Sequence, residues 1–281
     1  MTGQGVAMTA FVEVADRVYA LRYPVLDVTV TLVVGDGAAL VVDTLSTPDQ
    51  AAELAEAIRA VTPYPLTIVN THHHFDHSFG NATLAAGGTE IWAHEAAAAH
   101  LRERGAHWQR IWYEQCLALE PELAEGLAEA RIRPPDRTVH TEATLDVGGR
   151  PVRLRHLGRG HTDGDLVVLV PDADVVVAGD LVEESGPPDF GDAYPLEWPE
   201  TLAALDRLLS PATVVLPGHG APVDGAFVRA QHALLTELDW LIRDGHADGA
   251  PERAVAQKSP FGPDQSLVAV ARGYAELSGR V

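Results

Sequence analysis

The segment 71–77 gathers side chains that bind metal ions. It reads THHHFDH and contains the spacing H-x-H-x-D-H, in which His72, His74, Asp76 and His77 are the metal-competent residues. Imidazole and carboxylate groups suit zinc, iron or manganese better than calcium. The short spacing lets a single loop supply ligands to two adjacent ions. An apolar strand precedes the run within the chain, which makes a chance cluster or a tag-like tract the weaker interpretation.

Three later segments add candidate ligands. His161 stands in the glycine-flanked sequence GHTDGD, Asp180 ends the sequence AGD, and His219 stands in the sequence PGHG. Together with the first segment, they supply five histidines and two aspartates. This set is large enough to hold two ions of the kind that prefer nitrogen and carboxylate ligands.

Short apolar runs precede these polar residues along the chain. Each of four runs ends at one of them: 41–42 at Asp43, 68–69 at the histidine run, 175–178 at Asp180, and 214–216 at His219. Buried strands that end in functional side chains are a usual way for a rigid scaffold to position a site. We therefore expect these strand ends to meet.

The remaining pattern alternates between strands and helices. Strands are expected at 11–23, 28–34, 39–42, 66–69, 139–147, 152–157, 166–170, 175–178 and 214–216, where apolar residues dominate between turn signals. Thr47, Pro48 and Gln50 have the types that begin a helix with a capping box. The Ala-rich region at about 95–133 is expected to form a helical insert, and about 224–281 a C-terminal helical tail.

Length and charge limit the classes of function. The 281 residues suffice for one large domain, and 40 acidic against 20 basic residues give a net charge of -20. This charge repels nucleic acid and anionic membrane surfaces, so neither is expected as a partner. The single cysteine, Cys116, allows no disulfide within the chain, and neither a signal peptide nor a membrane-length apolar run is recognisable. These features predict a cytoplasmic protein.

The order of the four motifs resembles that of the metallo-β-lactamase-fold hydrolase superfamily. H-x-H-x-D-H, G-H-T-x-G-D, G-D and G-H-G follow one another, and the resemblance covers roughly 11–220. It implies an α/β fold, a four-layer αββα sandwich with the metals at one edge of its two sheets. The whole chain, 1–281, is interpreted as a single domain of this type.

The resemblance also implies a role for each candidate ligand. It assigns the first metal to His72, His74 and His161, the second to Asp76, His77 and His219, and the bridging position to Asp180. Two zinc ions are the implied cofactor, with iron or manganese as alternatives. His73 occupies a spacer position and receives no ligand role.

The implied reaction is hydrolysis of a small molecule that contains a carbonyl ester, thioester, lactone or related bond. Two cations lower the pKa of a shared water and give hydroxide near neutral pH. Asp76 is a candidate to move a proton to the leaving group. Tyr194 is a candidate to assist the carbonyl, as a tyrosine does in lactonase-like relatives, or else a packing aromatic. Asp43 and Asp165 either orient ligand histidines or hold turns.

Other functions stay open at this point. β-Lactam hydrolysis is one, although Asp180 stands where the commonest true β-lactamases of this fold carry cysteine. A mononuclear iron oxidoreductase resembling persulfide dioxygenases is a second, and a metal-binding protein without catalysis is a third. The C-terminal region lacks the clustered basic residues with which glyoxalase II-like enzymes hold glutathione. The sequence gives no indication of the oligomeric state.

Overall fold

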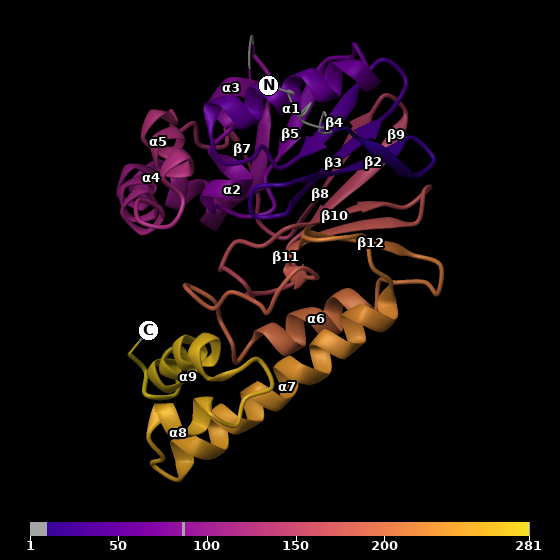
Figure 1. Cartoon of the computed structure of the whole chain (residues 1–281). Coiled ribbons are helices and arrows are strands. Elements are labelled where there is room, and N and C mark those ends of the chain that lie inside the picture. Colours follow the sequence, from indigo (N-terminus) through magenta and orange to yellow (C-terminus); the bar gives the residue numbers. More distant parts are fainter. Residues whose placement is uncertain (1–9, 86–87, 281) are drawn as a thin grey trace, which may run out of the picture.

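The chain folds into the predicted four-layer α/β sandwich. A computed structural model describes residues 10–85 and 88–280. In Figure 1, α1 and α3 cover one side of the strands, and α6 and α7 lie along the opposite side. Among the described residues, no helix is both long enough and apolar enough to cross a membrane.

The first half of the chain builds the first sheet. Its strands are β1 (Val12–Ala15), β2 (Val18–Tyr23), β3 (Val28–Val34), β4 (Ala39–Val42), β5 (Leu66–Val69), β6 (Ile91–His94) and β7 (Arg137–Val139). Its helices are α1 (Pro48–Val61), α2 (Phe75–Ser78), α3 (Asn81–Leu84), α4 (Glu95–Cys116) and α5 (Pro121–Glu129). The last two occupy most of the region expected to be a helical insert.

The second half of the chain builds the second sheet and the helices beneath it. The strands are β8 (Glu142–Val147), β9 (Arg150–Arg155), β10 (Val167–Val170), β11 (Val175–Glu183) and β12 (Val214–His219). The helices are α6 (Trp198–Asp206), α7 (Gly225–Ala247), α8 (Glu252–Ala256) and α9 (Pro263–Leu277). β11 and β12 extend beyond the apolar runs that the sequence marks as strands.

The two halves meet along neighbouring strands. The strand order is β7-β6-β5-β4-β3-β12-β11-β10-β9-β8, with β2 also paired to β3 and β1 to β2. β12 reaches β3 through a single residue pair, His219 with Val28. This contact lies at the end of β12 that carries a candidate ligand, so the seam between the halves passes beside the site.

Alternating side chains fill the layers on both faces of each sheet. In β4, Leu40 and Val42 face the core between the sheets, whereas Val41 packs toward α1. In β11, Val177 faces the same central core and Val176 packs toward α6 and α7. A strand that is buried on both faces reads as a continuous apolar run, which is the pattern found in the sequence.

The loops that carry the candidate ligands begin from well-defined elements. Thr47 caps α1 by accepting a hydrogen bond from the backbone N–H of Gln50. The Gln50 side chain in turn accepts from the N–H of Ser46, one residue before the expected position. α2 begins within the histidine run, and its Phe75, together with Phe79 just after the helix, packs against residues of α4 and α5. The insert therefore supports the loop that follows β5.

Candidate metal centre

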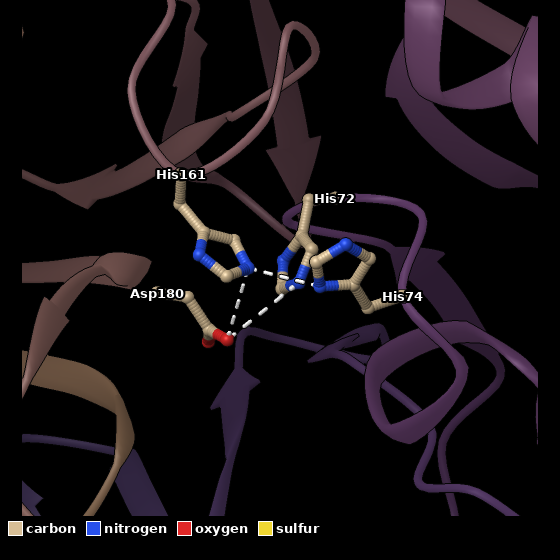
Figure 2. Close-up of side chains that lie close together, drawn as sticks. All are labelled: His72, His74, His161 and Asp180. Atoms are coloured by element: carbon tan, nitrogen blue, oxygen red, sulfur yellow. Dashed lines mark hydrogen bonds and ion pairs between the residues drawn. The ribbon is translucent and has the colours of Figure 1, made fainter. Parts of the chain in front are cut away.

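Four side chains from three distant segments converge at one edge of the sheets (Figure 2). His72 and His74 come from the loop after β5, His161 from the loop after β9, and Asp180 from β11. The His161 Nε2 atom lies 2.9 Å from His74 Nδ1 and 3.4 Å from Asp180 Oδ2. His72 Nε2 lies 3.7 Å from the same carboxylate oxygen. All four side chains are buried.

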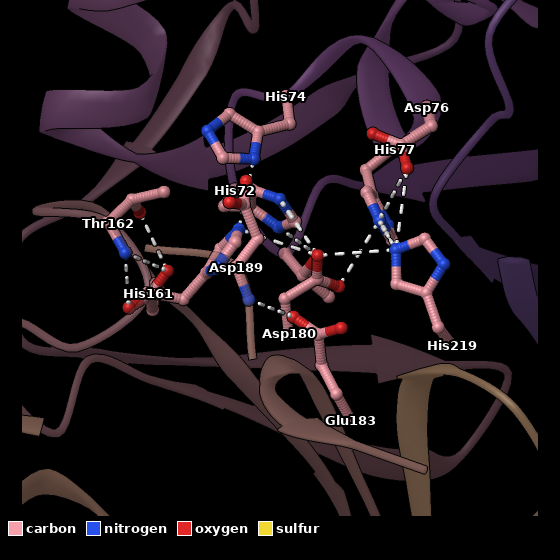
Figure 3. A network of polar contacts seen from close by, with 12 residues as sticks. His72, His74, Asp76, His77, His161, Thr162, Asp180, Glu183, Asp189 and His219 are labelled. Carbon is pink, nitrogen blue, oxygen red and sulfur yellow. Dashed lines mark hydrogen bonds and ion pairs between the residues drawn. The ribbon is translucent and has the colours of Figure 1, made fainter. Parts of the chain in front are cut away.

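A second group of three ligands lies on the other side of Asp180 (Figure 3). The Nε2 atoms of His77 and His219 are 3.3 Å apart. Asp76 Oδ2 lies 3.4 Å from His219 Nε2 and 3.6 Å from His77 Nε2. Asp76 and His77 belong to α2, whereas His219 ends β12. The two groups therefore combine ligands from both halves of the chain.

Asp180 faces both groups at once. Its Oδ1 atom lies 3.2 Å from His77 Nε2, and its Oδ2 atom lies 3.3 Å from His219 Nε2 and 3.4 Å from His161 Nε2. A carboxylate in this position can contribute one oxygen to each of two adjacent ions. The structure thus brings together all seven side chains that the sequence assigns as metal ligands.

The donor set fits divalent cations. Two imidazole nitrogens that face each other at 2.9 Å must share one proton or bind one cation together, and imidazole is a preferred ligand for zinc and iron. The Nε2 atom of His72 is buried and has no hydrogen-bond partner among the described residues. Buried polar atoms normally have partners, so this nitrogen is available as a ligand.

The site is strongly polarised by its own charges. Burial disfavours the ionised form of Asp180, but His77 and His219 outweigh this effect and hold the pKa of the carboxyl well below its usual range. Burial disfavours protonation of His77, yet Asp180 and Asp76 raise its pKa well above the ordinary value. Such opposed shifts at one point are typical of functional sites.

Asp43 orients one of the ligands from behind. Its Oδ2 atom lies 2.9 Å from His77 Nδ1, which leaves His77 Nε2 facing the site. The same carboxylate accepts hydrogen bonds from the N–H and the hydroxyl of Thr71. Asp43 directly follows β4 and has a φ of 69°, a conformation that aspartate and asparagine tolerate better than most residues. Asp43 therefore both holds the turn after β4 and orients His77.

Replacement of Asp43 by asparagine is expected to weaken metal binding or activity by about 10- to 100-fold, the usual cost of losing a carboxylate behind a ligand histidine. Asparagine preserves the shape and suits the backbone. Competition with a chromophoric chelator measures the affinity. Asp174→Asn is the matched control, because Asp174 has a φ of 51° and its carboxylate accepts hydrogen bonds from the hydroxyls of Ser210 and Thr213, away from the candidate ligands. Equal affinities for the two variants would contradict the assigned role.

Asp165 holds its own turn. Its carboxylate accepts hydrogen bonds from the backbone N–H and the hydroxyl of Thr162. No contact between this carboxylate and a ligand histidine occurs among the described side chains. Of the two interpretations that the sequence leaves open, the turn role is therefore the one the contacts support. The turn fixes the segment that carries His161.

Tyr194 lies apart from the two ligand groups. Its ring packs between the guanidinium groups of Arg159 and Arg272, at 4.1 and 5.6 Å from the ring centroid. It lines a cavity with Leu196 and Glu197, and not the one into which the ligands open. This placement favours the packing role of Tyr194 over assistance to a substrate carbonyl.

Asp192 is a site residue that the sequence analysis does not identify. Its Oδ1 atom lies 2.9 Å from His74 Nε2, and its Oδ2 atom lies 3.2 Å from His73 Nε2. The bond to His74 leaves the Nδ1 atom of that ring facing His161 and Asp180. Asp192 therefore orients the ring of His74 in the same way that Asp43 orients the ring of His77. No local motif marks it, because the two residues are 118 positions apart.

The C-terminal helix α9 holds the loop that carries Asp192. The guanidinium of Arg272 donates hydrogen bonds to the backbone carbonyls of Gly191, Asp192 and Ala193. The bond to the Asp192 carbonyl is 2.9 Å long. Three bonds from one side chain fix the loop in place. Through this loop, α9 positions the Asp192 carboxylate, which in turn orients His74.

Replacement of Arg272 by methionine is expected to weaken binding of the first metal by about tenfold, in the range found for groups that orient a ligand. The arm of the side chain remains, but the three donors are lost. Affinity is measured by chelator competition beside the melting temperature. Arg243→Met is the control, because Arg243 pairs with Asp239 within its own helix. A lower melting temperature with unchanged metal affinity would show that Arg272 supports the fold alone.

Gly218 lies against Asp180. A Cβ atom at this position would lie 1.7 Å from Asp180 Oδ1 and 2.9 Å from the Asp180 backbone nitrogen. Real carbon atoms do not approach so closely, so β11 and β12 reach this distance only because residue 218 has no side chain. The glycine of the G-H-G motif is thus explained by the position of the Asp180 carboxylate.

The two ligand groups open into a cavity of about 310 Å³. Apart from the ligands, its wall combines the apolar side chains of Leu26, Phe75 and Trp112 with the carboxylates of Glu183 and Asp189. Burial raises the pKa of Glu183 to about 8, and the negative charge of Asp180 adds to the shift. A cation bound at the ligands would act in the opposite direction.

Comparison with known proteins agrees with the motif order. The family model described as "Metallo-beta-lactamase superfamily" matches residues 23–219. The chain is 33% identical over 102 residues to metallo-beta-lactamase IND-1 of Chryseobacterium indologenes, covering 35% of this chain and 43% of that protein. It is 31% identical over 200 residues to a hydroxyacylglutathione hydrolase of Acidiphilium cryptum, covering 70% and 67%.

Coverage of the other curated relatives is partial. A Bacillus cereus metallo-beta-lactamase type 2 is 28% identical over 158 residues, which span 54% of this chain and 51% of that protein. The chain therefore spans about half the length of this relative and of IND-1. Activity and substrates do not transfer directly over such partial matches.

Solved structures show the same fold. The crystal structure of the DIM-1 metallo-beta-lactamase has a TM-score of 0.64 at 22% identity, covering 82% of this chain and 97% of that one. The mono-zinc form of FIM-1 from Pseudomonas aeruginosa has a TM-score of 0.65 at 19% identity, covering 82% and 96%. The family model matches most of the chain, and the fold agrees. The chain therefore belongs to the metallo-beta-lactamase superfamily of metal-dependent hydrolases.

Proposed function

We propose that the protein is a dinuclear metal-dependent hydrolase that cleaves a small carbonyl ester, thioester, lactone or related bond. The observation that carries the proposal is the position of Asp180, which lies between two groups of three ligands at the floor of a cavity. A structural metal site is normally closed, whereas a catalytic one keeps access to solvent or substrate.

The proposed cofactor is two zinc ions, with iron or manganese as alternatives. His72, His74 and His161 would hold one ion, and Asp76, His77 and His219 the other, with Asp180 between them. Cations in these positions would polarise a carbonyl and lower the pKa of water to near neutrality. Asp43 and Asp192 would keep His77 and His74 in the tautomers that present a free nitrogen to the site.

Asp76 is proposed to move a proton as well as to act as a ligand. Its carboxylate lines the cavity beside His219. Burial alone would raise the pKa of Asp76, but His77 and His219 lower it to about 2, so the group is ionised near neutral pH. An ionised carboxylate at the cavity wall can accept a proton from water and release it to a leaving group.

The test is hydrolysis by metal-loaded protein of a panel of carbonyl esters, thioesters, lactones and β-lactams. His74→Ala should abolish turnover of whichever substrate is cleaved. His232→Ala, at a half-buried position of α7, controls for the loss of a histidine elsewhere. Turnover that survives in His74→Ala would contradict a mechanism that depends on this site.

β-Lactam hydrolysis is the second candidate, because several curated relatives bear that name. The carboxylate of Asp180 at the proposed bridging position and a cavity without lysine or arginine among its described lining residues both count against it. Metal analysis of protein purified without added metal addresses the iron alternative. Two equivalents of zinc would favour hydrolysis, whereas a single iron would favour oxygen chemistry.

A further inference from the structure

The cavity wall carries two carboxylates that are not assigned as metal ligands. From them we infer, resting on the proposed hydrolase function, that the substrate bears a positively charged ammonium group within a few bonds of the scissile carbonyl. The inference depends on three features of the same cavity: its acidic side chains, its aromatic side chains, and the lack of lysine and arginine among the lining residues described there.

Glu183 and Asp189 form the acidic wall. Both line the cavity beside Asp180, as Figure 3 shows. The Glu183 carboxylate accepts one long hydrogen bond from the backbone N–H of Asp189, at 3.4 Å, and Asp189 accepts one from the N–H of Gly191. Neither carboxylate forms an ion pair within the described part of the chain. A cationic group bound beside Glu183 would favour its ionised form, against the burial that raises its pKa to about 8.

The same cavity wall also includes apolar and aromatic side chains. Phe75 and Trp112 lie with their ring centroids 5.1 Å apart and share the cavity with Leu26. The face of a tryptophan or phenylalanine ring attracts a cation through its quadrupole. An alkylated ammonium group would thus find both carboxylates and aromatic rings in one cavity, a combination that suits it better than a neutral or anionic group.

An anionic substrate would find no such partner. Of the described residues that line the cavity, none is lysine or arginine. Arg272 is engaged by three backbone carbonyls, and Arg159 is paired with Glu197. The net charge of -20 also raises the local concentration of cations and lowers that of anions. The residues that line the cavity and the electrostatic field of the whole protein therefore both favour a positively charged substrate.

The test compares substrates of matched shape and different charge. Zinc-loaded protein is assayed with the acetyl thioesters of thiocholine, 3,3-dimethylbutanethiol and 3-mercaptopropionate, which are cationic, neutral and anionic. Each turnover consumes one water and releases acetate, a proton and the thiol, which is detected by a thiol reagent. A second pair places the same cationic or neutral group on the acyl side of a 4-nitrophenyl ester. We expect kcat/KM to be at least about tenfold higher for the cationic member than for its neutral isostere in one series.

Variants then locate the source of the preference. Glu183→Gln and Asp189→Asn should each reduce the ratio of cationic to neutral kcat/KM, and the double variant should bring it close to one. Glu184→Gln is the matched control, because it removes the same charge one residue further along, outside the cavity wall. The ratio is measured within each variant, so a general loss of activity does not imitate the effect.

The outcomes separate the inference from the proposed function. Hydrolysis without a cationic preference in either series, or with an anionic preference, would overturn the inference and leave the hydrolase intact. If nothing is hydrolysed, the hydrolase proposal fails, and calorimetric binding of choline against 3,3-dimethylbutan-1-ol decides the inference alone. Tighter binding of choline that is lost in Glu183→Gln would support it, and equal binding would overturn it.

Discussion

Asp180→Asn is expected to lower kcat/KM by about 10³-fold or more, together with the loss of at least one bound metal. The reason is that Asp180 lies within 3.7 Å of a nitrogen of His72, His77, His161 and His219. Asparagine keeps the volume but removes the charge that offsets two cations. A loss of about 4 kcal/mol of stabilisation in the transition state corresponds to this factor.

The measurement combines metal content with steady-state kinetics on the best substrate. Asp206→Asn is the control, because Asp206 forms an ion pair with Arg229 on the far side of the sheet. The control should retain both metals and full turnover. If Asp180→Asn kept two metals and normal kcat/KM, the carboxylate would not bridge the two groups, and the dinuclear proposal would have to be abandoned.

Gly218→Ala is expected to lower the free energy of unfolding by about 3 kcal/mol or more and to reduce metal affinity at the same time. The added methyl group would overlap Asp180 Oδ1 at 1.7 Å, and the nearby backbone of β11 prevents an easy escape. Overpacking of a tightly packed interior commonly costs about 1–3 kcal/mol, and this contact is closer than most. The carboxylate must therefore move or the strands must separate.

Denaturant unfolding and chelator competition test the two effects together. Gly186→Ala is the control, since an added methyl there has no atom within 4 Å. A Gly218→Ala protein as stable as the wild type, with unchanged metal affinity, would mean that the strands at this position are not held at the observed distance. Lower stability with unchanged metal affinity would mean that the close packing of the two strands is not needed to position Asp180 for metal binding.

The sequence predicts much of this site because the candidate ligands follow buried strands. His72 and His74 come directly after β5, and Asp180 and His219 lie near the ends of β11 and β12. Apolar runs and short polar motifs are local signals, so they can be read without knowing which strands are neighbours. The order of the layers can also be predicted from the sequence, because strands that are buried on both faces require helices outside them.

The supporting groups could not be predicted in the same way. Asp192 reaches His74 across 118 positions, and Arg272 reaches Asp192 across a further 80. Nothing in either local sequence signals these contacts, because they depend on how α9 packs beside the loop. Glu183 is a similar case: it enters the cavity because β11 continues past the run that ends at Ala178. Only the tertiary arrangement reveals such residues.

The single-pair seam between β12 and β3 has a mechanical consequence. His72, His74, Asp76 and His77 belong to one half of the chain, whereas His161, Asp180 and His219 belong to the other. Ions shared by these residues would cross-link two halves whose β-ladders, among the described strands, meet through the single pair His219 and Val28. Forced separation of the halves would then have to break metal–ligand bonds at this edge. Such ions would also limit how far the two halves can separate.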